Sequence, residues 1–231
     1  TRTHVLTCAA LLLPAFCWAS ETGAFIEVAS SSFSNSIPIY HLINGMKYPY
    51  KDGDTAFTHN ALEFGYKFKQ MEIAALLRYD YNLKFNKDAF ELVYNNLNGI
   101  TPSTVKTYNP QLHASHFSST GIKLATAHDW SNQLSSKVAL SLLNASDLIN
   151  GDIWGSTTVD NAGSYTGTLY IDYSYDKDKL FKRPDSSAHG IGYALDASMQ
   201  YTPTDKLHFL LDIRDLLAVI HWNDATYTKA Q

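Results

Sequence analysis

Residues 61–85 read ALEFGYKFKQMEIAALLRYDYNLKF, in which two runs of alternating apolar and polar side chains meet at a short break. A period of two residues is typical of β-strands, because successive side chains of a strand point to opposite faces. With Lys69 and Gln70 as the turn, Phe68 and Met71 fall opposite each other in an antiparallel hairpin. The sequence therefore predicts a hairpin with one large, aromatic and uncharged face.

The apolar face of this hairpin needs a cover, either a second sheet in a soluble protein or lipid around a membrane barrel. Its second strand spans 71–85, whereas strands of globular proteins usually have about 5 to 6 residues. This length favours the membrane barrel, whose strands alternate between lipid-facing and lumen-facing side chains. The residues that we expect to face lipid are Leu62, Phe64, Tyr66, Phe68, Ile73, Leu77, Tyr79, Ile191, Tyr193 and Leu195.

The opposite face of the predicted strands carries acidic and basic side chains in similar numbers. The residues that we expect to face the lumen are Glu63, Lys67, Glu72, Arg78, Asp80, Lys123, Asp172, Asp196, Asp212 and Arg214. In a narrow barrel opposite charges pair and fill the interior, whereas in a wide barrel they line water. Since an ion-selective pore would carry one sign in excess, the balance of charges favours structural pairing.

Composition limits the classes of protein that this chain can represent. The 231 residues suffice for one barrel or sandwich domain, and 13 % of them are aromatic while only 17 % are charged, which suits strands with one face in an apolar medium. A net charge of −4 without any Lys/Arg cluster argues against a nucleic-acid partner. Beyond the N-terminus, no run approaches the roughly 20 apolar residues of a membrane-spanning helix.

The N-terminal residues have the order of a secretory signal peptide. Arg2 lies in a short polar start, an apolar core follows over 5–16, and Cys17-Trp18-Ala19 resembles a small-x-small cleavage site. We therefore expect a signal peptide over 1–19, cleaved after Ala19, and export of a single β-barrel domain, 20–231, to the outer membrane. Both cysteines lie inside the signal, so the exported chain has no disulfide framework.

The rest of the chain continues the strand pattern, interrupted by irregular stretches. Further strands are predicted at 23–30, 121–130, 138–142, 168–175, 190–201 and 207–214. The apolar stretch 216–222 either continues the last strand past a β-bulge near Asp215 or begins another strand. Loops are predicted at 31–56, 86–120 and 144–166, with a short helix over 88–97 that ends at Asn98-Gly99. Outer-membrane barrels alternate short turns with long loops, and this order fails late in the chain. We therefore expect a missed strand near 105–116 or 153–159.

The nine histidines raise the question of catalysis or metal binding. No G-x-S-x-G or H-E-x-x-H motif is present, and Asp52-Gly53-Asp54 lacks the closing Glu of a calcium loop. We predict no catalytic residue, no metal ligand and no cofactor. If the protein were an enzyme, the candidates would be His59, His128 and His208, which lie on or beside predicted strands.

The signal peptide, the repeated strands of about ten residues and the aromatic strand ends resemble Gram-negative outer-membrane β-barrel proteins. The stretch GIGYALDASMQYTPTDKLHFLLDIRDLLAVIHW, residues 190–222, is similar to late hairpins of uncharacterised exported barrel families. The resemblance implies an all-β fold, an antiparallel transmembrane β-barrel of about 8 to 12 strands with long outer loops. Such barrels usually end on an aromatic residue and this chain ends on Ala230-Gln231, so we expect it to be C-terminally truncated.

The function that these features favour is a pore or a passive component of the cell envelope, porin-like in architecture, with outer-membrane lipid as its partner. The first alternative is a soluble periplasmic β-sandwich that serves as a binding or adhesin-like module. The second alternative is a barrel enzyme that acts on lipid or peptide. No residue points to a particular transported molecule or protein partner.

Overall fold

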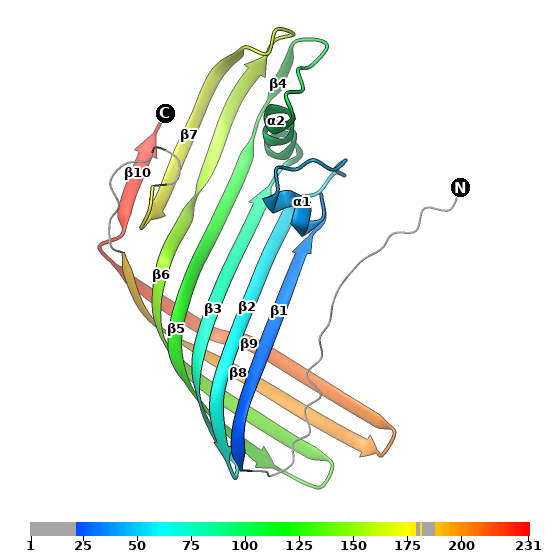
Figure 1. Cartoon of the computed structure of the whole chain (residues 1–231), viewed down its shortest axis with the longest axis vertical. Helices are drawn as coiled ribbons and strands as arrows, with labels where there is room; N and C mark the ends of the chain where they lie inside the picture. Colours follow the sequence, from blue (N-terminus) through cyan, green and yellow to red (C-terminus); the bar gives the residue numbers. More distant parts are fainter. Residues whose placement is uncertain (1–21, 179–180, 182–187) are drawn as a thin grey trace.

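The computed structural model of the chain is a single β-sheet with two helices at one end, and it describes residues 22–178, 181 and 188–231 (Figure 1). The helices are α1 (Ile39–Ile43) and α2 (Lys87–Asn98). The strands are β1 (Gly23–Ser34), β2 (Thr55–Phe68), β3 (Met71–Phe85), β4 (Lys106–Tyr108), β5 (Gln111–Asp129), β6 (Leu134–Val159), β7 (Tyr165–Tyr175), β8 (His189–Thr204), β9 (Leu207–Asn223) and β10 (Thr226–Ala230). In this described part, neither helix is long and apolar enough to cross a membrane. The expected signal peptide lies outside the described residues.

The long strand β6 divides the sheet into two branches. The strands are antiparallel and follow the order β1-β2-β3-β5-β6 up to this point. The first half of β6 pairs with β8, which pairs with β9, and its second half pairs with β7, which pairs with β10. Because β7 and β8 follow each other along β6, they share one position in the sheet. The connection between β7 and β8 therefore does not link two neighbouring strands of the sheet. For this reason the expected order of short turns and long loops fails late in the chain.

A β-bulge in β6 marks the point of division. The register with β5 shifts between His116 and Ser118, and Asp147 adopts a positive φ of 56°. The Ser118 hydroxyl donates a hydrogen bond to the Asp147 carboxylate, which holds the bulge in place. An extra residue in one strand bends that strand and increases its twist. The bulge therefore lets the two branches leave β6 in different directions (Figure 1).

The hairpin that the sequence predicts over 61–85 is confirmed. β2 and β3 pair in a continuous register in which Phe68 lies opposite Met71. The turn residue Lys69 has a positive φ of 54°, in line with the tight turns that two-residue hairpin loops favour. All large apolar side chains of the predicted row consequently lie on one face of the hairpin.

The helix expected over 88–97 is also confirmed, as α2. The side-chain oxygen of Asn86 caps its first turn by accepting a hydrogen bond of 2.9 Å from the Ala89 N–H. Gly99 ends the helix in a left-handed conformation, with a φ of 63°. The buried Phe90 of the helix packs against Phe85 at the end of β3, with ring centroids 5.2 Å apart. The helix thereby covers one end of the sheet.

The expected loops at 144–166 and 86–120 are wrong in their bounds. β6 continues unbroken through most of the first stretch, and β5 begins inside the second. The missed strand expected near 105–116 or 153–159 is found in both places. For β6 the reason is the bulge at Asp147, because its extra residue reverses the phase of the alternation and hides the rest of the strand from a search for period two.

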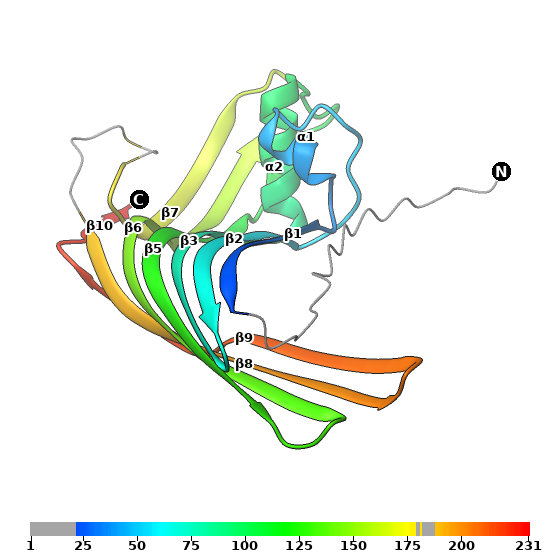
Figure 2. The same cartoon turned by 60° about the horizontal axis from the view of Figure 1, so that its bottom comes forward.

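The all-β antiparallel fold is confirmed, but the closed barrel is not. The sheet curves into an open arc (Figure 2), in which β1 pairs only with β2, and β9 only with β8, among the described strands. A closed barrel requires every strand to have two hydrogen-bonded neighbours. The backbones of β1 and β9 do not pair in this way, and only the Arg214 guanidinium reaches Glu27 across the gap, at 3.6 Å. The ten strands fall within the expected number, yet they form an open sheet.

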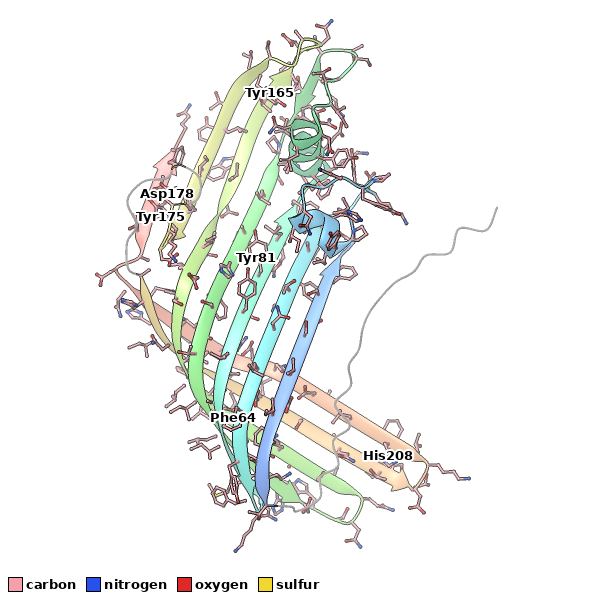
Figure 3. The ribbon with its side chains drawn as sticks, in the orientation of Figure 1. Phe64, Tyr81, Tyr165, Tyr175, Asp178 and His208 are labelled. Carbon is pink, nitrogen blue, oxygen red and sulfur yellow. The ribbon has the colours of Figure 1, made fainter. Side chains whose placement is uncertain are left out.

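The two faces of the sheet differ in chemistry. We call the face that carries Phe64 the apolar face and the opposite face, which carries Glu63, the charged face (Figure 3). Around β8 and β9 the charged face lines the inside of the arc (Figure 2), since side chains from the two edge strands meet there. α2 packs on the apolar face, at the end farthest from the hairpin turn at Lys69 (Figure 1).

Candidate functional site

The ten residues expected to face lipid all lie on the apolar face. Nine of them are exposed, from 40 % for Leu62 to 68 % for Ile191, and Leu195 is half-buried. They belong to continuous cross-strand rows, such as the one in which Phe64, Ala75 and Ile122 are successive register partners. Soluble monomers rarely expose apolar patches beyond about 300–600 Å². Among the described residues, the end near α2 has a protein cover, and Tyr173 and Tyr175 of β7 are also buried on this face.

A first ionic cluster on the charged face is centred on Lys123 of β5. Its ammonium group lies 2.8 Å from a Glu63 carboxylate oxygen on β2 and 3.1 Å from an Asp196 oxygen on β8. Neither strand is a direct neighbour of β5, so these contacts cross a strand on each side. The crossing is possible because the register partners of Lys123 are the small residues Ala74 and Ser141. One cation thereby compensates two carboxylates.

A second cluster has the reverse arrangement, with Glu72 of β3 between two lysines. Lys67 is its direct partner across the hairpin, with 3.5 Å between the charged atoms. Lys137 reaches the other carboxylate oxygen from β6, at 2.5 Å, and crosses β5 at the small residue Ala125. Positive and negative charges therefore alternate over this part of the face, which lowers the cost of their partial burial.

The third cluster surrounds Arg78 of β3. Its guanidinium donates to the Asp80 carboxylate at 2.7 and 3.1 Å and to the Asp215 carboxylate at 2.7 and 2.8 Å. The Nδ1 atom of His59 lies 3.0 Å from the second oxygen of Asp80. An arginine that forks between two carboxylates holds both in fixed positions. The cluster therefore ties β2 and β3 to β9, which lies on the far side of the arc.

Of the two alternatives for 216–222, the structure shows the first: β9 continues past a β-bulge at Asp215, and this bulge explains the contact. The pairing of β8 and β9 shifts at this point, and Asp215 has a φ of 53° while its N–H donates to the Asp196 carboxylate at 2.9 Å. Two consecutive side chains, Arg214 and Asp215, thereby both contact groups of the charged face. Arg214 reaches Glu27 of β1, and Asp215 reaches the third cluster.

Nine of the ten residues expected to face the lumen take part in these contacts. They are Glu63, Lys67, Glu72, Arg78, Asp80, Lys123, Asp196, Asp212 and Arg214. The structure places Asp172 elsewhere, on β7, where its carboxylate lies 3.3 Å from the Lys229 ammonium. The charged face therefore has two regions, the ionic clusters inside the arc and a separate region on the branch of β7 and β10.

Sequence reasoning missed Glu27, which lies beside Arg214, and Asp215 of the third cluster. Glu27 alternates with Ile26 and Val28 in β1, and this alternation was a usable signal. Asp215 gave no such signal, because a residue at a bulge does not follow the period of either flanking segment.

A cavity of about 450 Å³ lies beside the third cluster. Its polar wall includes Arg78 and Asp80, and its apolar wall includes Leu143, Leu148 and Trp222. A carboxylate that orients a histidine can help it to act as a general base. Asp80 lies beside His59 in this way, but its carboxylate also accepts hydrogen bonds from Arg78. In the described residues, no Ser or Thr hydroxyl is hydrogen-bonded to His59.

The two other histidines that an enzyme would use lie apart from any carboxylate contact in the described structure. His128 contacts the ring of Trp130 edge-on, with centroids 4.5 Å apart. His208 lies at the far end of the β8–β9 hairpin (Figure 3), where its Nδ1 is 3.2 Å from the Thr202 hydroxyl. Among the residues that the structure describes, no group of three or more His, Cys, Asp or Glu side chains could hold a metal ion.

The fold and its two faces define an all-β protein built on one curved antiparallel sheet. Comparison of the chain with protein families, curated proteins and solved structures found no match. The two faces of the sheet are therefore the features that bear on its function.

Proposed function

We propose that the protein is a passive component of the outer membrane, with its apolar face against lipid and its charged face turned away from lipid. The observation that carries this proposal is the distribution of charge. Large apolar side chains such as Phe64 and Ile191 are exposed, while charged ones such as Glu63 and Asp80 are buried. A protein that is surrounded by water has the reverse distribution, with charged side chains outside and large apolar side chains buried.

The lengths of the strands support this proposal. A transmembrane β-strand needs about 9–11 residues, and β2, β3 and β5 have 14, 15 and 19. The three tight turns, at 69–70, 130–133 and 205–206, lie at the same end of their strands, and both helices lie at the other end (Figure 1). Short turns on one side and long connections on the other are typical of outer-membrane barrels.

Aromatic residues near these turns give further support. Trp130 is exposed beside the turn between β5 and β6, and Tyr201 stacks on Phe209 beside the turn between β8 and β9. Aromatic rings with one polar edge prefer the boundary between lipid and water. The turn end of the sheet would therefore lie at one membrane surface.

The ionic clusters favour a passive component over an open pore. Arg78 and Arg214 each join β9 to a strand on the opposite side of the arc, so side chains occupy the space that a wide channel would leave to water. We expect the purified protein to give no steady ion conductance in planar lipid bilayers. A stable, salt-dependent conductance would show that the protein is a pore and would overturn the passive role.

Cell fractionation, with a matched pair of variants, tests the membrane location. We expect the full-length gene product in the outer-membrane fraction, with a band that shifts on electrophoresis when the sample is boiled. Phe64→Arg should abolish this band shift, because an arginine near the middle of the lipid layer costs about 2–4 kcal/mol. Tyr40→Arg, at an equally exposed aromatic residue of α1, should leave it unchanged. Recovery in the soluble periplasm, monodisperse without detergent, would overturn the proposal in favour of a soluble β-sandwich.

A further inference from the structure

Two exposed aromatic rings lie together on the charged face, outside the ionic clusters. Trp154 of β6 and Tyr170 of β7 are register partners, and their rings stack with centroids 5.7 Å apart and planes inclined by 18°. They remain 41 % and 39 % exposed. The two stacked rings form an apolar platform with a face that its partner ring does not cover and that a ligand can contact.

The platform borders an open depression of about 830 Å³ that crosses five strands. One cross-strand row on its floor comprises Thr55, Lys84, His113, Asp152 and Asp172, each the register partner of the next. In the adjacent row Gln111 is the register partner of Trp154. Amide and carboxylate groups are therefore placed directly beside the aromatic rings.

The two carboxylates beside the platform already have polar partners, and Lys84, a further charged residue of the floor row, lies on β3, two strands away from Trp154. The Asp152 carboxylate lies 2.9 Å from His113 Nδ1, and the Asp172 carboxylate lies 3.3 Å from the Lys229 ammonium. A cationic ligand would have to compete with these partners, and an anionic ligand would be repelled by the two carboxylates. Each carboxylate keeps lone pairs that can accept further hydrogen bonds, and the Asp152 side chain is 57 % exposed. The depression therefore favours a neutral ligand that is rich in hydroxyl groups.

We infer that this depression binds a neutral saccharide. The apolar face of a pyranose ring would stack on Trp154, which Tyr170 supports, while the sugar hydroxyl groups would donate to Asp152 and exchange hydrogen bonds with the Gln111 amide. The inference depends only on the charged face, so it stands whether or not the apolar face contacts lipid. It adds a binding activity to a protein whose proposed role is otherwise passive.

Isothermal titration of the purified full chain tests the inference, with maltohexaose and cellohexaose as probes. The protein is kept in lauryldimethylamine oxide, because maltoside and glucoside detergents would themselves present sugar rings to the site. We expect saturable binding of at least one probe. Trp154→Ala and Tyr170→Ala should each weaken it at least tenfold, and Asp152→Ala severalfold. Trp130→Ala, which removes an exposed tryptophan at the opposite end of the sheet, should leave the affinity unchanged.

Several results would overturn the inference. These are absence of saturable binding for both probes, an affinity that Trp154→Ala leaves unchanged, or equal losses in Trp154→Ala and Trp130→Ala. Circular dichroism and the heat-dependent band shift establish which variants are folded. If Trp154→Ala fails to fold, Asp152→Ala decides the question, because its exposed side chain is not part of a core. The membrane proposal is tested separately, because it fails if the protein stays soluble without detergent.

Discussion

Arg78 of β3 and Asp215 of β9 are 137 positions apart in the sequence, yet two hydrogen bonds of 2.7 and 2.8 Å join their side chains. Strands β5, β6 and β8 separate β3 from β9 in the sheet, so the contact spans the arc. It exists because the sheet curves and because the bulge at Asp215 turns this side chain to the charged face. The pair therefore fixes the curvature as well as two charges.

Asp215→Ala should weaken the curved arrangement of the sheet. The change leaves Arg78 with Asp80 as its remaining carboxylate partner, and we expect the free energy of unfolding to fall by about 1–3 kcal/mol. The loss is smaller than for a fully buried pair because the Asp215 side chain is 34 % exposed. Urea titration in detergent micelles measures it, with Asp205→Ala in the neighbouring turn as control. Equal stability of the two variants would contradict a structural role for the pair.

Lys123→Met should be more damaging than the loss of a peripheral lysine. It leaves Glu63 and Asp196 without their shared cation, and breaking a buried ionic group typically costs about 3–5 kcal/mol. Lys229→Met removes a lysine whose side chain is 70 % exposed, and we expect no measurable change, because water screens such pairs. The midpoint temperature of the heat-dependent band shift compares the two. Similar midpoints would mean that the Lys123 cluster is solvated.

Gly65→Ala should destabilise the hairpin because the new methyl group has no space. A Cβ atom at this position would lie 2.4 Å from the Ile73 carbonyl oxygen and 2.8 Å from the Phe25 ring. Such overpacking costs about 1–3 kcal/mol. At Gly23 nothing lies within 4 Å of the corresponding position, so Gly23→Ala is the matched control and should be neutral. Unfolding in urea separates the two variants, and a neutral Gly65→Ala would show that the Phe25 ring moves freely.

Acid should loosen the connection between β1 and β2. Hydrogen bonds from the Asn35 amide and the Thr55 hydroxyl lower the pKa of the Asp54 carboxyl below its ordinary value of 3.8. A carboxyl whose pKa is lower in the folded state stabilises that state above the unfolded pKa, and this contribution is lost as pH falls through the folded pKa. We expect proteolysis of 35–54 by pepsin to accelerate below about pH 4. Asp54→Asn should remove this part of the pH dependence, and an unchanged pH profile in that variant would refute the assignment.

Much of the local structure could be predicted from the sequence. The alternation over 61–85 determined the central hairpin, its register and its two faces, since the backbone of a strand fixes the direction of every second side chain. Asn86 and Gly99 determined the ends of α2 through contacts within a few residues. These features depend on near neighbours in the chain, so a linear pattern contains them.

The tertiary structure alone decided which groups meet across the sheet. The bulges at Asp147 and Asp215 reverse the alternation of side chains. For this reason the sequence pattern did not reveal the second part of β6, or Asp215 as a partner of Arg78. The platform of Trp154 and Tyr170 likewise arises only when β6 and β7 pair. By itself the sequence determined which side chains are apolar, which are charged and, between bulges, which of them share a face of a strand. Which strands lie opposite each other, and whether the sheet closes, depends on bulges, twist and pairing between distant segments, none of which a local period encodes.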